Sequence, residues 1–331
     1  MDPVSLALDG HVWRCDNGEC NAERYAYHSC RNRSCPKCHW EQTERWLALH
    51  RARQPSCPDF LLTVTLPAEL RGLARSHHRV VLGALCRSVA AAVLKLCRDE
   101  AFLGARPAIL VLLHTWTRDL RYHPHVHLLV SAGGLDESGH WVATRHADYL
   151  APAKALAIII RAKMRHALRQ AGLHHQAAPS AWKKPWILQC QHAGNGDKVL
   201  DYLAHYVFRV AITNSRIEAI DESGVTFRYR DRSTGETKHC TLPPFAFIAR
   251  FLQHVLPKGF AKIRSYGLLA PRHRRLLKLA HAQLGQRADA PPVRSTSVPS
   301  TTACQPAHRC PACGVGMMHR VQALPPRRGP P

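Results

Sequence analysis

The feature that most constrains the fold is the alternation of two hydrophobic periods between residues 58 and 217. Some stretches are short, apolar and β-branched, as is typical of strands, whereas others repeat apolar residues every three or four positions, as is typical of amphipathic helices. The strand-like stretches are 60–66, 109–116, 125–130 and 186–190, and the helix-like stretches are 79–98, 152–171 and 197–209. A short polar segment joins the second and third strands, which predicts an antiparallel hairpin. We therefore predict an α+β fold, in which a small antiparallel sheet carries helices on its face.

Composition divides the chain into four segments. Residues 10–45 are rich in cysteine and predict a zinc-binding module, and residues 58–217 form the main core. Residues 218–285 predict a hairpin followed by basic helical segments, which together extend the core. Residues 286–331 are rich in proline and serine and predict a flexible tail. The tail carries an incomplete zinc-ribbon pattern at Cys304, Cys310 and Cys313, which leaves metal binding there open.

The charge of the chain indicates a polyanionic partner. The sequence contains 46 Lys+Arg against 23 Asp+Glu, a formal net charge of +23, and such an excess attracts nucleic acid or an acidic membrane surface. We see no secretory signal and no uncharged apolar run of the ~18 residues that a membrane helix needs. We therefore expect a cytoplasmic, nucleoid-associated protein with a nucleic-acid partner and no membrane partner.

The cysteines near the start of the chain have the spacing of a zinc site. Cys15-x4-Cys20 and Cys35-x2-Cys38 can each supply two thiolates to a tetrahedral ion. Cys30 is a spare ligand in this pattern, and His28 is a weaker alternative. The surrounding segment has too few apolar residues to fold without a metal. The competing interpretation is that these are reduced structural cysteines.

A cluster of histidines on one predicted strand indicates a second metal site. His125 and His127 project from the same face of a strand, because side chains alternate. Hairpin pairing could bring His114 opposite one of them as a third ligand. The competing interpretation is chance, because a chain with 23 histidines produces clusters by accident.

Two tyrosines lie four residues apart on a predicted helix. Tyr202 and Tyr206 therefore share one helical face, where an isolated pair of phenols is usually packing. A phenolate that attacks a phosphodiester needs a nearby cation, which the histidine-bound metal would supply. The histidine pair, the tyrosine pair and the positive charge therefore support one another.

Basic residues in two segments are candidates for contacts with DNA phosphates, although each could equally belong to a solvated basic face. They are Arg31, Arg33 and Lys37 in the cysteine-rich module and Lys258, Lys262 and Arg264 near the end of the core.

These motifs together resemble the insertion sequence ninety-one family of transposases. The resemblance rests on SCRNRSCPKC at 29–38, HPHVH at 123–127 and Tyr202-x3-Tyr206 leading into RVAITNSR at 209–216. FLLTVTLP at 60–67, HVLPKGF at 254–260 and IRSYGLLA at 263–270 are also similar to blocks of that family, and the motifs follow its order.

The resemblance implies a nuclease of the HUH class, named for a histidine–hydrophobic–histidine motif, which cuts single-stranded DNA and moves it by a rolling-circle route. His125 and His127 would hold Mg²⁺ or Mn²⁺, with His114 as a third ligand. Tyr202 and Tyr206 would be the two nucleophiles. Cys15, Cys20, Cys35 and Cys38 would bind structural Zn²⁺. The partners would be single-stranded DNA at the element ends and target site, and the host replication machinery.

Other functions remain open from the sequence. A rolling-circle replication initiator or a relaxase would use the same chemistry, although the histidines precede the tyrosines here, which is opposite to the order in relaxases. A non-enzymatic, zinc-containing DNA-binding regulator would explain the charge and the cysteines but would leave the His-x-His and Tyr-x3-Tyr pairs as coincidence.

Overall fold

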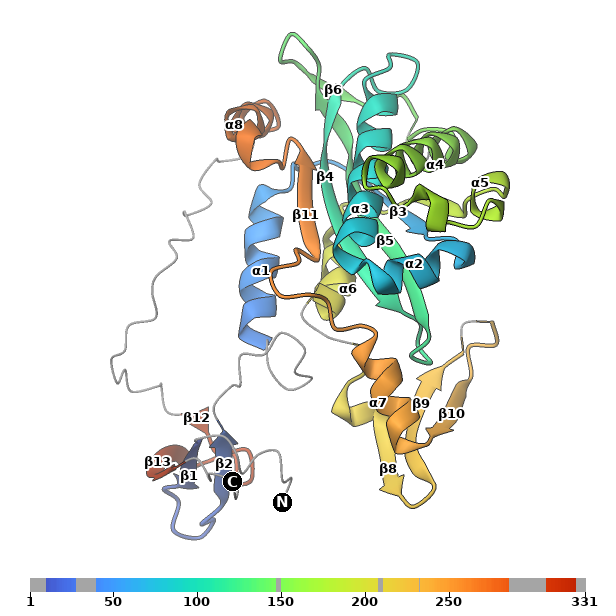
Figure 1. Cartoon of the computed structure of the whole chain (residues 1–331). Coiled ribbons are helices and arrows are strands. Elements are labelled where there is room, and N and C mark those ends of the chain that lie inside the picture. Colours follow the sequence, from blue (N-terminus) through green and yellow to red (C-terminus); the bar gives the residue numbers. More distant parts are fainter. Residues whose placement is uncertain are drawn as a thin grey trace. The chain divides into compact units, whose positions relative to one another are not determined.

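The computed structural model describes residues 10–27, 40–146, 150–207, 211–231, 233–285 and 308–325. Contacts divide the chain into two compact units. The terminal unit combines residues 1–38 with 292–331, and the core unit comprises residues 39–291. Each unit is described by itself (Figure 1).

The core unit is built on a six-stranded sheet in the order β11-β4-β5-β3-β7, with β6 paired to β5. All of its pairings are antiparallel. The central strand is β5, which runs for 14 residues and is almost completely buried. The strands are β3 (Asp59–Thr65), β4 (Arg106–Trp116), β5 (Tyr122–Leu135), β6 (Trp141–Ala143), β7 (Leu188–His192) and β11 (Ile263–Gly267).

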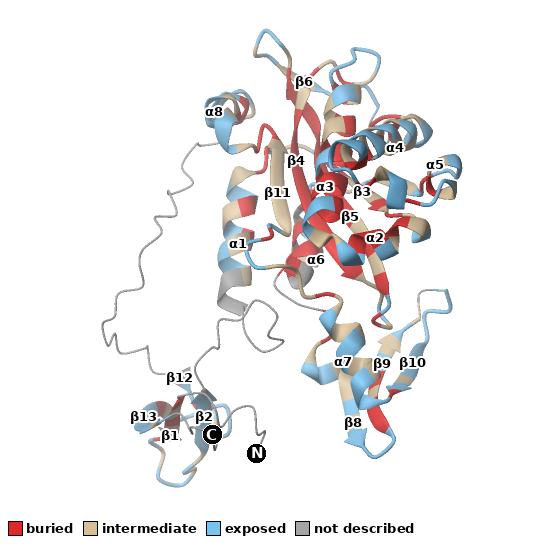
Figure 2. Cartoon of the chain, in the orientation of Figure 1, coloured by how far each residue is buried: buried red, intermediate tan, exposed pale blue. Residues whose placement is uncertain are grey.

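One face of the sheet carries the largest apolar cluster. Alternate residues of β3, such as Phe60, Leu62 and Val64, are fully buried on this face together with alternate residues of β4 and β5. Figure 2 shows the corresponding band of buried residues where helices cover the strands. The elements on this side are α2 (Arg71–Ser76), α3 (His78–Cys97), α4 (Ala153–Gln170), α5 (Ser180–Lys183) and the short 3₁₀ turns Ala68–Leu70 and His174–Gln176.

The opposite face carries a smaller cluster. Ala108 and Leu110 of β4 and Leu129 of β5 pack there against helix residues such as Leu200 and Leu277. The helices on this side are α1 (Trp40–Arg53), α6 (Asp197–Val207) and α8 (Arg274–Gln283), the last preceded by a 3₁₀ turn, Pro271–His273. Helices thus cover both faces of the sheet.

Helix α3 is long and apolar enough to cross a membrane by composition alone. It is the one described helix that meets this criterion, and 67% of its most apolar window is buried inside the protein. Val81, Leu85 and Val89 of this helix belong to the main apolar cluster. The helix therefore serves as a central core element of the sheet's first face.

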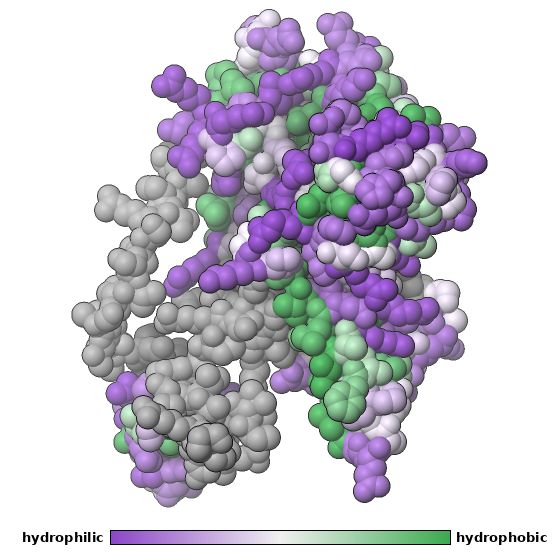
Figure 3. Space-filling view, viewed as in Figure 1, coloured by the Kyte–Doolittle hydropathy of each residue, from purple (hydrophilic) through white to green (hydrophobic). Residues whose placement is uncertain are grey.

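A three-stranded antiparallel sheet in the order β10-β9-β8 follows the main core. Its apolar side, centred on Phe227, packs with Leu120 from the β4–β5 turn. Phe245, Ile248 and Leu252 of α7 are exposed, and Figure 3 shows the apolar side chains gathered over this helix. The elements are the 3₁₀ turn Asn214–Arg216, β8 (Ile217–Asp221), β9 (Gly224–Arg230), β10 (Thr237–Leu242) and α7 (Pro244–Leu252).

The terminal unit is a four-stranded antiparallel sheet made from both ends of the chain. Its order is β12-β13-β1-β2, so β13 pairs along β1 from Gly10–Leu324 to Cys15–Met318. The strands are β1 (Gly10–Cys15), β2 (Glu23–Tyr27), β12 (His308–Arg309) and β13 (Met317–Leu324). Residues 308–325 thus contain paired strands, whereas the sequence suggested a flexible tail. The local sequence does not reveal this pairing, because the partner strand β1 lies nearly the whole chain away.

The predicted fold class is confirmed: the chain is α+β, with helices packed on an antiparallel sheet. The strand and helix stretches between 58 and 217 correspond to β3, α3, β4, β5, α4, β7 and α6. The sequence interpretation did not identify β11, which lies in a segment interpreted as basic and helical. Its pairing with β4 is a contact across about 150 residues that local periodicity does not reveal.

Candidate active site

Three histidines converge on the face of the sheet that carries α6. The antiparallel register places His114 of β4 directly opposite His125 of β5, and Leu112 opposite His127. His125 and His127 share a face because they are two residues apart. One ligand nitrogen from each of the three rings lies within 4.8 Å of the others. Three imidazole nitrogens at this spacing fit a single divalent ion.

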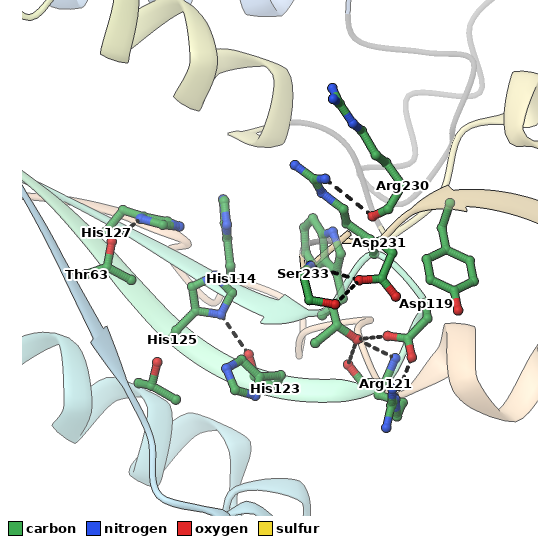
Figure 4. Close-up of a pocket in the computed structure, with 15 residues that line it drawn as sticks. Thr63, His114, Asp119, Arg121, His123, His125, His127, Arg230, Asp231 and Ser233 are labelled. Atoms are coloured by element: carbon green, nitrogen blue, oxygen red, sulfur yellow. Dashed lines mark hydrogen bonds and ion pairs between the residues drawn. The ribbon is translucent and has the colours of Figure 1, made fainter. Parts of the chain in front are cut away.

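Hydrogen bonds orient two of these rings. The Nδ1–H of His125 donates to the carbonyl oxygen of His123 at 2.7 Å, which leaves the lone pair on Nε2. The hydroxyl of Thr63 lies 3.0 Å from Nδ1 of His127 on the neighbouring strand. Figure 4 shows the three rings facing one another above β5, with Thr63 beside His127. Fixing the ring through its second nitrogen is how proteins commonly orient metal-binding histidines.

The environment keeps His114 neutral. Burial, followed by the neighbouring His127 and His125 and then Lys262, holds the pKa of His114 well below its usual range. Neutral imidazole is the form that donates a lone pair to a metal. The site therefore meets the chemical requirement of a metal ligand as well as the geometric one.

Replacing Thr63 with valine tests how far the hydroxyl supports His127. Valine keeps the β-branched shape that suits the strand but removes the hydrogen-bonding group. Because loss of such an outer partner usually weakens metal binding, we expect the Kd for Mn²⁺ to rise by about 10- to 100-fold in calorimetric titration. Thr65→Val, two residues along the same face, is the matched control. Equal losses in both variants would show that the hydroxyl of Thr63 has no special role.

The histidines line a cavity of about 530 Å³. Its other wall consists of Trp116 and the β4–β5 turn together with the end of β9 and the turn that follows. Figure 4 shows residues of these two segments, such as Asp119, Asp231 and Ser233, on the side of the view opposite to His127. The cavity is therefore open to a ligand that would contact the histidines and both turns at once.

Arginines give this cavity a positive rim. Asp119 pairs with Arg121 at 2.5 Å, and Asp231 pairs with Lys238 at 2.7 Å, so both carboxylates in the lining are neutralised by nearby cations. Arg118 and Arg230 form no ion pair with any described residue. The guanidinium of Arg118 donates to the carbonyl of Arg230, and that of Arg230 to the carbonyl of Gly235. These two exposed cations can accept an anionic ligand.

A buried histidine holds the turn that carries Arg118. Nε2–H of His254 donates to the carbonyl of Leu120 at 3.1 Å, and the hydroxyl of Thr115 lies 3.2 Å from its Nδ1. Burial lowers the pKa of His254 to about 4, so the ring is neutral and can accept from the threonine. His254 is thus a structural residue that fixes one wall of the cavity.

Helix α6 packs on the histidine face of the sheet. Its residues Leu203 and Val207 form a cluster with Leu112. Leu112 is two residues from His114 on the same side of β4 and is the register partner of His127. The backbone of α6 also carries the predicted nucleophiles, but the side chains of Tyr202 and Tyr206 lie outside the described residues.

The basic residues predicted to contact DNA lie on different parts of the structure. The ammonium of Lys262 lies 4.6 Å from the ring centre of Trp116, which in turn stacks on His114. Arg264 instead stacks on Phe260 and lies close to Gly83 of α3, on the other face of the sheet. Lys258 is exposed. Arg31, Arg33 and Lys37 lie outside the described residues.

Two of the predicted zinc ligands lie beside a second cysteine pair in the structure. Cys15 and Cys20 meet Cys310 and Cys313, and all four sulfurs lie within 4.8 Å of one another. The predicted partners Cys35 and Cys38 lie outside the described residues, as do Cys30 and His28. The motif Cys310-x2-Cys313 was a visible signal for this set, but nothing local connects it to the first cysteine pair.

Comparisons with known proteins identify the family of the chain. A family model described as a putative transposase matches residues 108–276, and another, described as a transposase zinc-binding domain, matches residues 4–66. The chain is 33% identical to "Putative transposase y4qJ" of Sinorhizobium fredii (strain NBRC 101917 / NGR234), over 99% of this chain and 88% of that protein. The chain belongs to the insertion sequence ninety-one family of transposases.

This transposase is also 32% identical to the transposase for insertion sequence element IS801 of Pseudomonas savastanoi pv. phaseolicola, over 78% of this chain and 66% of that protein. Two solved structures of the relaxase TrwC, both with DNA and one metal-free, align over 69% of this chain and 74% and 72% of theirs. The identity is 11% and the TM-score 0.28 in both cases. That likeness is too weak to support an inference about the reaction.

The match to a transposase zinc-binding domain supports structural zinc in this transposase. Four cysteine sulfurs are the donor set that zinc prefers in closed structural sites.

The sequence did not identify Thr63, Arg118 or Arg230 as residues of the candidate active site. Thr63 was detectable as a polar residue on the strand next to His127. The position of Arg230 beside the cavity instead depends on how the three-stranded sheet β10-β9-β8 packs on the core.

Proposed function

We propose that this transposase is a metal-dependent single-strand DNA endonuclease and strand transferase that works through a 5′-phosphotyrosine. The observation that carries the proposal is the convergence of His114, His125 and His127 in a cavity with a positive rim. The packing of α6 against Leu112, beside these histidines, supports it. Together they bring a candidate metal site, an anion-binding rim and the helix of two tyrosines to one face of the sheet.

The histidines would hold Mg²⁺ or Mn²⁺, which would supply Lewis-acid polarisation of the scissile phosphate. The β4–β5 pairing fixes where His114 and His125 lie, and Thr63 and the His123 carbonyl hold the two β5 rings in orientation. Such preorganised groups lower the barrier because they need not be rearranged during the reaction. Arg118 and Arg230 would bind flanking phosphates and orient the strand.

One of the two tyrosines would act as the nucleophile. Its phenolate oxygen forms a bond to the scissile phosphorus while the bond from phosphorus to the 3′ oxygen breaks, and that oxygen takes up a proton. The products are a 5′-phosphotyrosine on Tyr202 or Tyr206 and a free 3′-hydroxyl. Attack of a 3′-hydroxyl on the phosphotyrosine reverses the bond changes, rejoins DNA and restores the phenol.

Two tyrosines would allow two successive cleavages in one active site. The first cut leaves a 3′-hydroxyl that host polymerase can extend, and the second tyrosine then cuts the displaced strand, which gives a rolling-circle route. The phosphodiester energy is conserved in the covalent bond, so no nucleotide hydrolysis is required. The sequence accordingly contains no G-x4-G-K-S/T phosphate-binding loop.

The double variant Arg118→Gln with Arg230→Gln tests the positive rim. We expect weaker binding of single-stranded DNA and a smaller dependence of log Kd on log salt, by about 0.7 for each lost phosphate contact. Fluorescence anisotropy across a salt series measures both quantities. Arg272→Gln with Arg275→Gln removes the same charge from exposed positions outside the cavity and is the matched control. An identical change in salt dependence for both variants would exclude the rim as the binding site.

Cleavage of matched oligonucleotides tests the proposed function directly. Purified transposase is incubated with Mn²⁺ and an element-end sequence supplied either as a single strand or as a duplex. We expect cutting and a covalent protein–DNA product with the single strand, and little with the duplex. Cutting that leaves no covalent product, with water as the nucleophile, would contradict the proposal.

A further inference from the structure

Two hairpin turns from opposite ends of the chain face each other in the terminal unit. Cys15 ends β1 and Cys20 lies in the β1–β2 turn, and Cys310 and Cys313 both lie in the β12–β13 turn. The Sγ atoms of Cys15 and Cys313 are 3.7 Å apart, and those of Cys20 and Cys310 are 3.8 Å apart. Tetrahedral zinc with Zn–S bonds of about 2.3 Å requires edges of about 3.8 Å, whereas a disulfide requires about 2.05 Å. The four sulfurs therefore have the spacing of a zinc site.

The backbone around the second pair is shaped for this approach. The N–H of Gly316 donates to Sγ of Cys313 at 3.4 Å, and the N–H of Cys310 donates to the carbonyl of Gly316 at 2.7 Å. A Cβ atom on Gly316 would lie 2.5 Å from Sγ of Cys15. Glycine is thus required where the two turns meet, because any side chain would push the sulfurs apart.

Contacts beside the sulfurs also join the two ends. The carboxylate of Asp16 accepts from the N–H of Met317 at 2.7 Å and lies 3.1 Å from Nε2 of His319. Among the residues of this unit that the structure describes, the cluster beside the sulfurs has three buried members, Cys15, Cys310 and Met318, and Val12 is also buried. So small a cluster contributes little stability by burial, and small domains of this kind usually depend on a metal or disulfides.

We propose that Cys310 and Cys313 complete a single zinc site with Cys15 and Cys20, so that the C-terminal strands are an integral part of the N-terminal zinc module. The matched zinc-binding domain covers residues 4–66 and so does not include this second pair. The zinc ion closes the chain on itself by joining residues that are 298 apart in sequence. Residues 308–325 are consequently structural, and their loss removes half of the zinc ligands.

Cysteine alkylation of the full-length wild-type protein tests this assignment. The zinc-loaded protein is treated with N-ethylmaleimide before and after zinc removal by a chelator, and the modified sites are identified by mass spectrometry. We expect Cys15, Cys20, Cys310 and Cys313 to be protected together and to become reactive together, because they share one ion. Cys240, a half-buried cysteine on β10, reports reactivity unrelated to zinc. Reaction of Cys310 and Cys313 in zinc-loaded protein while Cys15 and Cys20 stay protected would overturn the proposal.

Serine variants separate this site from the pairing that the sequence favoured. Cys310→Ser with Cys313→Ser should lose about one zinc ion per chain by elemental analysis and should expose Cys15 and Cys20 to alkylation. Cys35→Ser with Cys38→Ser should leave the protection of Cys15 and Cys20 intact, and Cys240→Ser should lose no zinc. The opposite result, loss of Cys15 protection only in the Cys35–Cys38 variant, would assign the zinc to the first segment alone.

Discussion

Replacing His125 and His127 with alanine should reduce DNA cleavage by about 10³-fold or more. The metal they would hold supplies several kcal/mol of charge stabilisation in the transition state, and each 1.4 kcal/mol is worth about a factor of ten. His114 alone offers one nitrogen and cannot retain the ion. The rate of cutting a labelled single strand in Mn²⁺, measured under single-turnover conditions, gives the effect on the chemical step.

Binding of DNA should survive this change, because the rim arginines and the basic surface remain. His123→Ala is the matched control: its ring lies 5.5 Å from that of His125 and lines the same cavity, but it is not one of the three converging residues. The backbone carbonyl that orients His125 is kept in that variant. If His123→Ala loses as much activity as the double variant, or if the double variant still cuts, the assignment of the metal site is wrong.

Changing both Tyr202 and Tyr206 to phenylalanine should abolish the covalent protein–DNA product. Phenylalanine keeps the ring and the helix but removes the attacking oxygen, so the expected loss is complete within the detection limit of a denaturing gel. Leu203 and Val207 still anchor α6 on the sheet in this variant. The thermal midpoint should therefore change little, which separates a chemical effect from an unfolding effect.

Tyr229→Phe is the control for the tyrosine pair. Tyr229 lies on β9 and lines the histidine cavity, so its phenol is a rival nucleophile on geometric grounds. We expect this variant to form the adduct at a rate close to that of the unmodified protein. If the Tyr202–Tyr206 variant still forms the adduct and Tyr229→Phe does not, the nucleophile is Tyr229 of β9 and not a tyrosine of α6.

Much of the core fold could be predicted because its signals are local. The β-branched run at 60–66 and the apolar runs around His114 and His125 specify strands through residue type and spacing alone. Helix α3 was recognisable from the spacing of Val81, Leu85 and Val89. The strand order was not predictable in full, since the pairing of β11 with β4 depends on contacts between distant segments.

Some residues of the candidate site could likewise be predicted from local sequence, whereas others could not. The shared face of His125 and His127 follows from strand alternation, and a hairpin was sufficient to expect His114 nearby. The position of Arg230 could not be expected, because the end of β9 lies at the cavity through the packing of its sheet, including Phe227, with Leu120 of the β4–β5 turn. The cluster of Cys15 and Cys20 with Cys310 and Cys313 could not be predicted for a similar reason, because the two pairs are distant in sequence and meet only through the fold.

We expect a tyrosine of α6 to attack DNA beside the histidine cluster. The most direct measurement is mass spectrometry of tryptic peptides from the wild-type protein after reaction with a single-stranded oligonucleotide and Mn²⁺. Trypsin cuts after Lys198 and Arg209, so the peptide VLDYLAHYVFR carries both candidate tyrosines. We predict a 5′-phosphonucleotide on Tyr202 or Tyr206, formed only when Mn²⁺ or Mg²⁺ is present. A nucleotide attached to any other residue, or attachment that is equally efficient in a chelator, would contradict the account.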